Sequence, residues 1–311
     1  MNKFRSFSIL TVAVTYLLIF IGGLVRVSGA GMGCPDWPKC FDRWIPPTNI
    51  NQLPDHIDPA LFNIVLAWIE YLNRLFGVFV GMFITLAMIL AVRNYLLPKK
   101  VKGAVVSAFF LTLVQGWLGS VLVHTVLNPI TITLHLLLAL IIVLLLVYAA
   151  QSSYYIEFPV YETNSEYDPK LKYFFYTLGV ILFIEIILGT EIRGGLEMIR
   201  KENPNIDSQF LLKMLGPFKY AHTILGIVIV GLSTFIYFKL VVKSINPSTV
   251  IKSTSLLIIL LVFSQIILGE ILVFFDVIPL IQLFHLWFAS LILGLVMVQY
   301  MAWNRSQLMN E

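Results

Sequence analysis

Apolar residues dominate eight long stretches of the chain, and polar residues cluster in the segments that separate them. The stretches cover residues 7–29, 66–92, 103–126, 131–151, 171–192, 218–242, 251–275 and 280–302. About 20 apolar residues are needed for a helix to cross the hydrocarbon layer of a bilayer. Because the backbone finds no water there, each stretch must satisfy its hydrogen bonds internally. The pattern therefore predicts an all-α membrane protein with eight transmembrane helices.

Two pairs of these predicted helices repeat one another, in Gln115–Leu137 and in Gln265–Trp287. In both, a Gln is followed by Leu-Gly and later by a Pro, with a His six residues after the Pro. The matched residues are Gln115 and Gln265, Gly119 and Gly269, Pro129 and Pro279, and His135 and His285. Packing alone does not explain why a repeat keeps an ionisable residue inside an apolar helix. We therefore interpret the repeat as functional.

The remaining predicted helices also form pairs. Aligned without gaps, Tyr71, Asn73 and Gly77 match Tyr220, His222 and Gly226, and Gly22 and Arg26 match Gly189 and Arg193 more weakly. The sequence therefore predicts two pseudo-symmetric four-helix bundles, residues 1–151 and 171–311, joined by a polar cytoplasmic connector over 152–170. The first half carries the longer outside loop.

Composition and charge place the protein in the cell membrane. The chain is 59% hydrophobic and 12% charged. If the N-terminus is inside, the inner segments hold more Lys and Arg than the outer ones, so both termini are expected in the cytoplasm. The net charge of +4 then reflects topology, and no basic stripe indicates nucleic acid. Small residues at 28–30 would suit signal cleavage, but the repeat requires the first helix to be retained.

The only cysteines, Cys34 and Cys40, lie in the predicted outside loop over residues 30–65. On the oxidising side of a membrane, two cysteines across a Pro-rich turn are expected to form a disulfide. The bond would either staple the loop or take part in redox chemistry.

In the second half, His222 and His285 are predicted one to two turns below the outer ends of their helices. Two neutral imidazoles that face each other across a four-helix bundle are a usual axial ligand pair for a b-type haem. We therefore predict haem b between these two residues, with Gly226 and Gly269 leaving room for it. Arg193 lies at the same rim and is a candidate partner for a propionate, as is its repeat counterpart Arg26.

The first half differs because Asn73 stands where the second half has His222. Asn is a poor iron ligand, so a haem there would be five-coordinate on His135 or take a sixth ligand from elsewhere. His124 is near in depth but lies outside the repeat, and a hydrogen-bonded His at a helix end is the simpler interpretation. A haem with two protein ligands in the second half and a haem with a free position in the first half would have separate tasks. The second half would transfer electrons and the first half would carry out the substrate chemistry.

Charged residues within membrane spans are candidates for function. The candidates that we take from the predicted helices are Glu70, Arg74, Glu185 and Glu270. For Glu185 and Glu270, the alternative to a functional role is a bond to a neighbouring helix. Glu70 is the favoured catalytic candidate because it lies one turn above Asn73.

Several motifs together resemble the haem A synthase family. They are GGLVRVSGAGMGCPDWPKC, the Glu70 to Arg74 segment, QGWLGS with His135, ILGTEIRGG, His222, and QIILG with His285. The resemblance covers nearly the whole chain, and the Cys loop combined with the four helix starts makes it specific. It implies an eight-helix fold in two halves. It also implies oxidation of the C8 methyl group of haem O to a formyl group, which gives haem A for cytochrome oxidase.

The resemblance also implies roles for individual residues. His222 and His285 would hold a resident haem b, and His135 would ligate haem O, with Glu70 as the catalytic acidic residue and Arg74 beside it. The family has His at the position of Asn73, which leaves either a vacant iron position for an oxidant or an altered activity. Cys34 and Cys40 match the family's loop pair.

The implied partners are membrane lipid, an electron donor and haem O synthase. The protein could also form a homo-oligomer. Two other functions compete with the enzyme: a non-catalytic b-type cytochrome that carries electrons, and a haem-binding transporter or chaperone.

Overall fold

The computed structural model describes residues 2–158, 168–203, 210, 213–244, 246–275 and 277–308. Within these ranges, eight helices are long and apolar enough to cross a membrane, and an isolated bridge between Cys40 and Arg43 is the only β-pairing. The predicted all-α class and the eight predicted spans are thus confirmed. The chain divides into two compact units, Met1–Ser153 (unit 1) and Tyr154–Glu311 (unit 2), which we describe separately.

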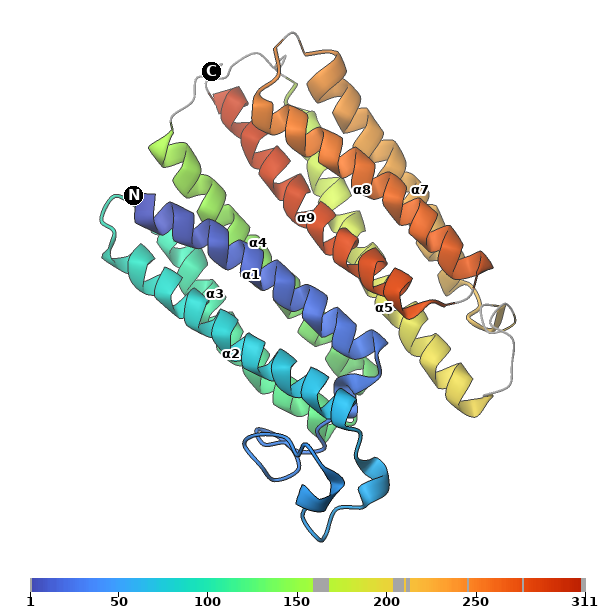
Figure 1. The fold of residues 1–311 in the computed structure, drawn as a ribbon. Coiled ribbons are helices and arrows are strands. Elements are labelled where there is room, and N and C mark those ends of the chain that lie inside the picture. The colour runs from blue at the N-terminus through green and yellow to red at the C-terminus, as the bar shows by residue number, and fades with distance from the viewer. Residues whose placement is uncertain are drawn as a thin grey trace. The chain divides into compact units, whose positions relative to one another are not determined.

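Unit 1 is built from four long helices and one long loop, which Figure 1 shows in blue to green. The helices are α1 (Asn2–Val27), α2 (Ile64–Arg93), α3 (Lys99–His124) and α4 (Pro129–Glu157), and the last residues of α4 belong to unit 2. The loop between α1 and α2 contains the short helices η1 (Ala30–Met32), η2 (Ile50–Gln52) and η3 (Pro59–Leu61). It protrudes beyond the ends of α1 and α2 (Figure 1). A long loop between these helices is what the sequence predicts. Its position outside the membrane stays a prediction, and we call it the outer loop.

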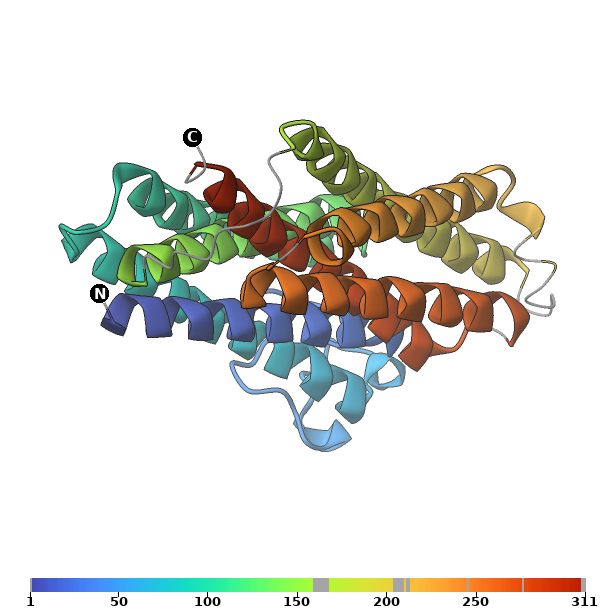
Figure 2. The ribbon, with the colours of Figure 1, turned by 90° about the horizontal axis from the view of Figure 1, so that it is seen from above.

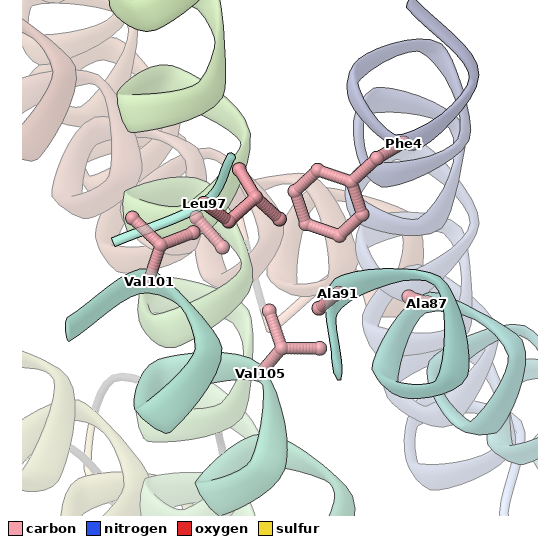
Figure 3. Packing of buried hydrophobic residues seen from close by; sticks show 7 residues of the cluster. Phe4, Ala87, Ala91, Leu97, Val101 and Val105 are labelled. Atoms are coloured by element: carbon pink, nitrogen blue, oxygen red, sulfur yellow. The ribbon is translucent and has the colours of Figure 1, made fainter. Parts of the chain in front are cut away.

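Small side chains let the helices of unit 1 approach one another closely. In the cluster shown in Figure 3, Phe4 of α1 packs with Ala87 and Ala91 of α2, and with Val101 and Val105 of α3. Because lipid tails are as apolar as these side chains, close van der Waals packing is what favours helix association in a membrane. Alanines at the contact surface therefore contribute by being small.

Unit 2 contains α5 (Leu171–Glu202), α7 (Phe218–Tyr237), α8 (Thr249–Phe274) and α9 (Pro279–Leu308). The last turn of α7 continues as the π-helical turn η4 (Phe238–Val242). Each long helix contacts two others in the cyclic order α5, α7, α8, α9. Helices α8 and α9 lie side by side in both views (Figures 1 and 2). The pseudo-symmetry between the two units stays a prediction.

Local sequence explains where the helices begin. The side chain of Asn63 accepts hydrogen bonds from the backbone N–H groups of Val65 and Leu66, and so caps α2. The repeated prolines, Pro129 and Pro279, are the first residues of α4 and α9. At this position the missing N–H of proline removes no hydrogen bond from the helix.

Helix α5 is longer than the sequence pattern predicts, because it ends at Glu202 rather than at residue 192. Beyond the apolar stretch, Arg193 Nε lies 2.9 Å from Glu197 Oε1, one turn later on the same helix. Such pairs support a helix in water. Hydropathy therefore marks the span but not the end of this helix. The predicted connector, 152–170, begins inside α4, and its residues 159–167 lie outside the described ranges.

Candidate functional site

In unit 2, His222 of α7 and His285 of α9 lie close together. Their ring centroids are 6.2 Å apart and the ring planes make an angle of 57°. Two imidazoles that bind one metal from opposite sides need about 2 Å for each bond and half a ring on each side, which places the ring centres about 6 Å apart. The spacing of the two rings therefore fits an iron ion between them.

A glycine on a neighbouring helix lies against each of these rings. A Cβ atom at Gly189 of α5 would lie 3.4 Å from His222 Cε1, and one at Gly269 of α8 would lie 3.6 Å from His285 Cε1. Gly226, which the sequence suggested as room for a cofactor, lies instead against Glu185, since its Cβ would be 3.5 Å from Oε1. The glycines thus make room for the two imidazole rings and for a carboxylate.

Unit 1 has a related arrangement around His135 of α4. A Cβ atom at Gly119 would lie 3.8 Å from His135 Cε1, and Gln115 Nε2 donates a hydrogen bond of 3.0 Å to the His135 carbonyl oxygen. His135 Nδ1 and Asn73 Oδ1 are both buried without a hydrogen-bond partner among the described residues. Buried polar atoms are rarely left unpaired. Two such atoms fit a site that is completed by a ligand.

Glu185 of α5 has a partner that the sequence does not reveal. Its Oε1 lies 3.0 Å from Nδ1 of His222. From the sequence, Glu185 was a candidate only because it is a charged residue within a predicted span, and a bond to a neighbouring helix was one of its two possible roles. By contrast, Glu270 of α8 is exposed.

The two arginines predicted as propionate partners lie near helix ends. Arg193 donates hydrogen bonds to Glu197 and to the side-chain oxygen of Gln282, which lies one turn before His285 on α9. It therefore ties the C-terminal part of α5 to the first turn of α9. Arg26 lies in the last turn of α1. A propionate contact of either residue stays a prediction.

Glu70 and Arg74 of α2 hold the outer loop. Glu70 is 4% exposed, and its Oε2 accepts a 2.7 Å hydrogen bond from the Cys34 N–H, while its Oε1 accepts one of 2.5 Å from Arg74 Nη2. Arg74 also donates to the backbone carbonyls of Cys34, Asp36 and Lys39, at 3.2, 2.7 and 2.8 Å. Both carboxylate oxygens of the predicted catalytic residue are thus engaged. The sequence showed that the two residues share a helix face but not that they clamp the loop.

Cys34 and Cys40 form the predicted disulfide. The two residues are 0% and 1% exposed, and they pack with Phe41 of the loop and with Ala67 of α2. Thiol–disulfide exchange requires access of a thiolate to a sulfur atom. Of the two roles left open by the sequence, the burial of this bond favours the staple.

His124 lies at the end of α3. Its Nδ1 is 2.8 Å from the carbonyl oxygen of Ser120, one turn earlier, and the side chain is exposed. The contact agrees with the simpler interpretation, a hydrogen-bonded His at a helix end.

Comparisons with known proteins bear on what these sites do. A family model described as cytochrome oxidase assembly protein matches residues 5–297. The heme A synthase of Shewanella oneidensis is 36% identical over 149 residues, which are 45% of this chain and 43% of the relative. The heme A synthase of Geobacillus kaustophilus is 25% identical over 193 residues, 61% of this chain and 56% of the relative. For the heme A synthase of Bacillus cereus the identity is 29% over 126 residues, 40% of this chain and 36% of the relative.

The matched stretches thus span about half or less of the length of these relatives. The family model, in contrast, covers the chain almost from end to end. The protein therefore belongs to the cytochrome oxidase assembly protein family.

Proposed function

We propose that the protein is a haem A synthase, which oxidises the C8 methyl group of haem O to a formyl group. The 6.2 Å spacing of the His222 and His285 rings carries the proposal, because it suits a haem iron in a member of the cytochrome oxidase assembly protein family. The relatives named heme A synthase support the reaction.

In unit 2, His222 and His285 would hold a resident haem b, which supplies one-electron transfer when it is bound. Because both histidines would be engaged in holding the haem, the site would serve electron transfer rather than the binding of an oxidant. Arg193, which already fixes the first turn of α9 through Gln282, would lie at the rim where the propionates emerge.

In unit 1, His135 would bind haem O from one side and Asn73 would face its other side. An amide binds iron poorly but forms hydrogen bonds, so Asn73 would position a water molecule or an oxidant beside the substrate rather than serve as a ligand. We assign Glu70 the acidic role in methyl oxidation, either by moving a proton or by positioning the methyl group. Arg74 fixes its carboxylate through hydrogen bonds of 2.5 and 3.2 Å.

We extend the proposal to the setting of the enzyme. The eight helices would lie in the cell membrane with both termini in the cytoplasm. Haem O synthase would supply the substrate, and an electron donor would reduce the resident haem.

Pigment analysis tests the proposal. The chain is expressed together with a source of haem O, and the haems are extracted and separated. We expect haem A or its alcohol intermediate, together with haem B from the resident site. Extracts that contain haem B alone would identify an electron carrier and contradict the proposal. His135→Ala should abolish haem A but keep the spectrum of the bis-His haem, whereas His285→Ala should lose that spectrum.

A further inference from the structure

The carboxylate of Glu185 lies in a confined place between α5 and α7. Its Oε1 is 3.0 Å from Nδ1 of His222, within hydrogen-bond distance, although the two groups are not aligned as a hydrogen bond. The Glu185 side chain is 14% exposed, and its Oε2 is buried without a hydrogen-bond partner among the described residues. A carboxylate inside a membrane span is unfavourable unless it has a partner, so its place beside a ring nitrogen calls for an explanation.

Two glycines build this place reciprocally. Gly189, one turn after Glu185 on α5, lies against His222, with 3.4 Å between its added Cβ and the ring Cε1. Gly226, one turn after His222 on α7, lies against Glu185, with 3.5 Å between its added Cβ and Oε1. Each polar side chain therefore packs on a glycine of the opposite helix, which restricts both the carboxylate and the ring.

Three polar residues precede, by four positions, a glycine that lies against a histidine ring: Gln115 before Gly119, Glu185 before Gly189 and Gln265 before Gly269. Among these three, only Glu185 is a carboxylate. Gln115 donates to the backbone carbonyl of His135, and the ring Nδ1 atoms of His135 and His285 have no hydrogen-bond partner in the described part of the chain. Among the three proposed haem ligands, His222 alone thus has a carboxylate beside its ring nitrogen.

We propose that Glu185 is a positioning residue for the resident haem, which accepts the Nδ1 hydrogen of His222, directs Nε2 to the iron and lowers the midpoint potential of the haem. The inference rests on the proposed function, in that it takes His222 and His285 as the axial pair. A carboxylate on the second nitrogen of a ligating His fixes its tautomer and raises its basicity. A more basic ligand favours ferric over ferrous iron, so the site becomes a stronger electron donor.

A redox titration of Glu185→Gln tests the inference. The full-length protein is purified with its haem, and reduction is followed by the absorption of the low-spin haem. The amide keeps the shape of Glu185 but is a weaker acceptor, so we expect reduction to become about tenfold more favourable, or about 59 mV for one electron. Glu270→Gln is the matched control, because it makes the same change at an exposed carboxylate of unit 2. Its potential should equal that of the unchanged protein.

Equal potentials in the unchanged protein, Glu185→Gln and Glu270→Gln would overturn the inference. Glu185→Asp covers the case in which Glu185→Gln does not retain the haem. It keeps the negative charge, but its shorter side chain moves the carboxylate oxygen away from the His222 ring. If only Glu185→Asp retains haem, a midpoint potential above that of the unchanged protein supports the inference, and an equal potential overturns it. An unchanged protein without a low-spin bis-His spectrum would overturn the proposed function itself, whatever the variants do.

Discussion

At the residue scale, the glycine beside each imidazole determines where the ring can lie. Gly269 leaves 3.6 Å between an added Cβ and His285 Cε1, an ordinary van der Waals distance, so alanine fits there but a longer side chain overlaps the ring. We predict that Gly269→Leu reduces the haem b content of the purified protein by about tenfold or more, equivalent to about 1.4 kcal/mol of binding free energy. Gly269→Ala should retain haem b, as should Gly119→Leu in unit 1. The haem content per protein, measured from its reduced pyridine complex, checks this. Equal losses in both leucine variants would point to general destabilisation.

The backbone of Gly33 in the outer loop lies close to the backbone of α2. A Cβ atom there would lie 2.3 Å from the carbonyl oxygen of Leu66, and backbone atoms of a helix cannot move aside as a flexible side chain can. We predict that Gly33→Ala lowers the free energy of unfolding by about 1–3 kcal/mol. Thermal denaturation in detergent measures the change. Gly103→Ala, where an added Cβ meets nothing within 4 Å, is the control. Because alanine favours a helix more than glycine does, this variant should unfold at the same or a higher temperature.

Some residues of the candidate sites could be found from the sequence and others could not. The repeat identified His135, His222 and His285, because ionisable residues are rare in apolar helices and two of these three stand at equivalent positions. It could not reveal that Glu185 meets His222, since the contact depends on which faces of α5 and α7 pack together. The clamp of Glu70 on the Cys34 N–H was hidden for the same reason.

At the scale of elements, a polar contact near the helix ends ties two neighbouring helices together. Arg193 of α5 donates to Gln282 of α9, and a hydrogen bond to a charged group contributes about 1.5–3 kcal/mol. We predict that Arg193→Ala and Gln282→Ala are less destabilising together than the sum of their separate effects, by about that amount. A double-mutant cycle on thermal or denaturant unfolding measures it, and additive effects would contradict it. Glu197→Gln removes only a pair with an exposed carboxylate and should have a smaller effect, about 0.5 kcal/mol.

The outer loop depends on α2 in a similar way. Arg74 reaches three loop carbonyls at once, which the planar guanidinium can do and a lysine ammonium cannot reproduce. We predict that Arg74→Lys opens the loop more often, so that a thiol reductant reduces the buried disulfide at least about tenfold faster, as expected from the loss of one charged hydrogen bond. Alkylation of the released thiols measures the rate. Arg43→Lys removes one exposed contact within the same loop and should leave the rate near that of the unchanged protein.

At the scale of the whole molecule, the bilayer explains why the fold class could be predicted from the sequence and the backbone conformation of the outer loop could not. Lipid permits few spanning structures, so apolar length alone gave all eight helices. The loop over residues 30–63 is free of that restriction. Phe41 and Asp42 adopt left-handed backbone angles there, with φ of 55° and 60°, and their N–H groups donate to Asp36. Conformations that are uncommon for such residues cannot be read from their types.

The division into two compact units gives a last prediction, about how far the effect of the disulfide extends. Cys34 and Cys40 belong to unit 1, whereas both proposed ligands of the resident haem belong to unit 2. Replacing both cysteines by serine should lower the free energy of unfolding by about 2 kcal/mol, the value expected for a bond that closes a short loop. It should also reduce haem A formation, because Glu70 loses its fixed partner at the Cys34 N–H.

The haem b content and its low-spin spectrum should remain unchanged in the same variant. Pigment extraction and absorption spectra of one preparation check both parts of this prediction. His285→Ala provides the opposite pattern, because it removes a ligand of unit 2 and leaves the loop of unit 1 intact. A serine variant that loses haem b as completely as His285→Ala would mean that the resident site depends on the outer loop. The two compact units would then act as one in binding the cofactor.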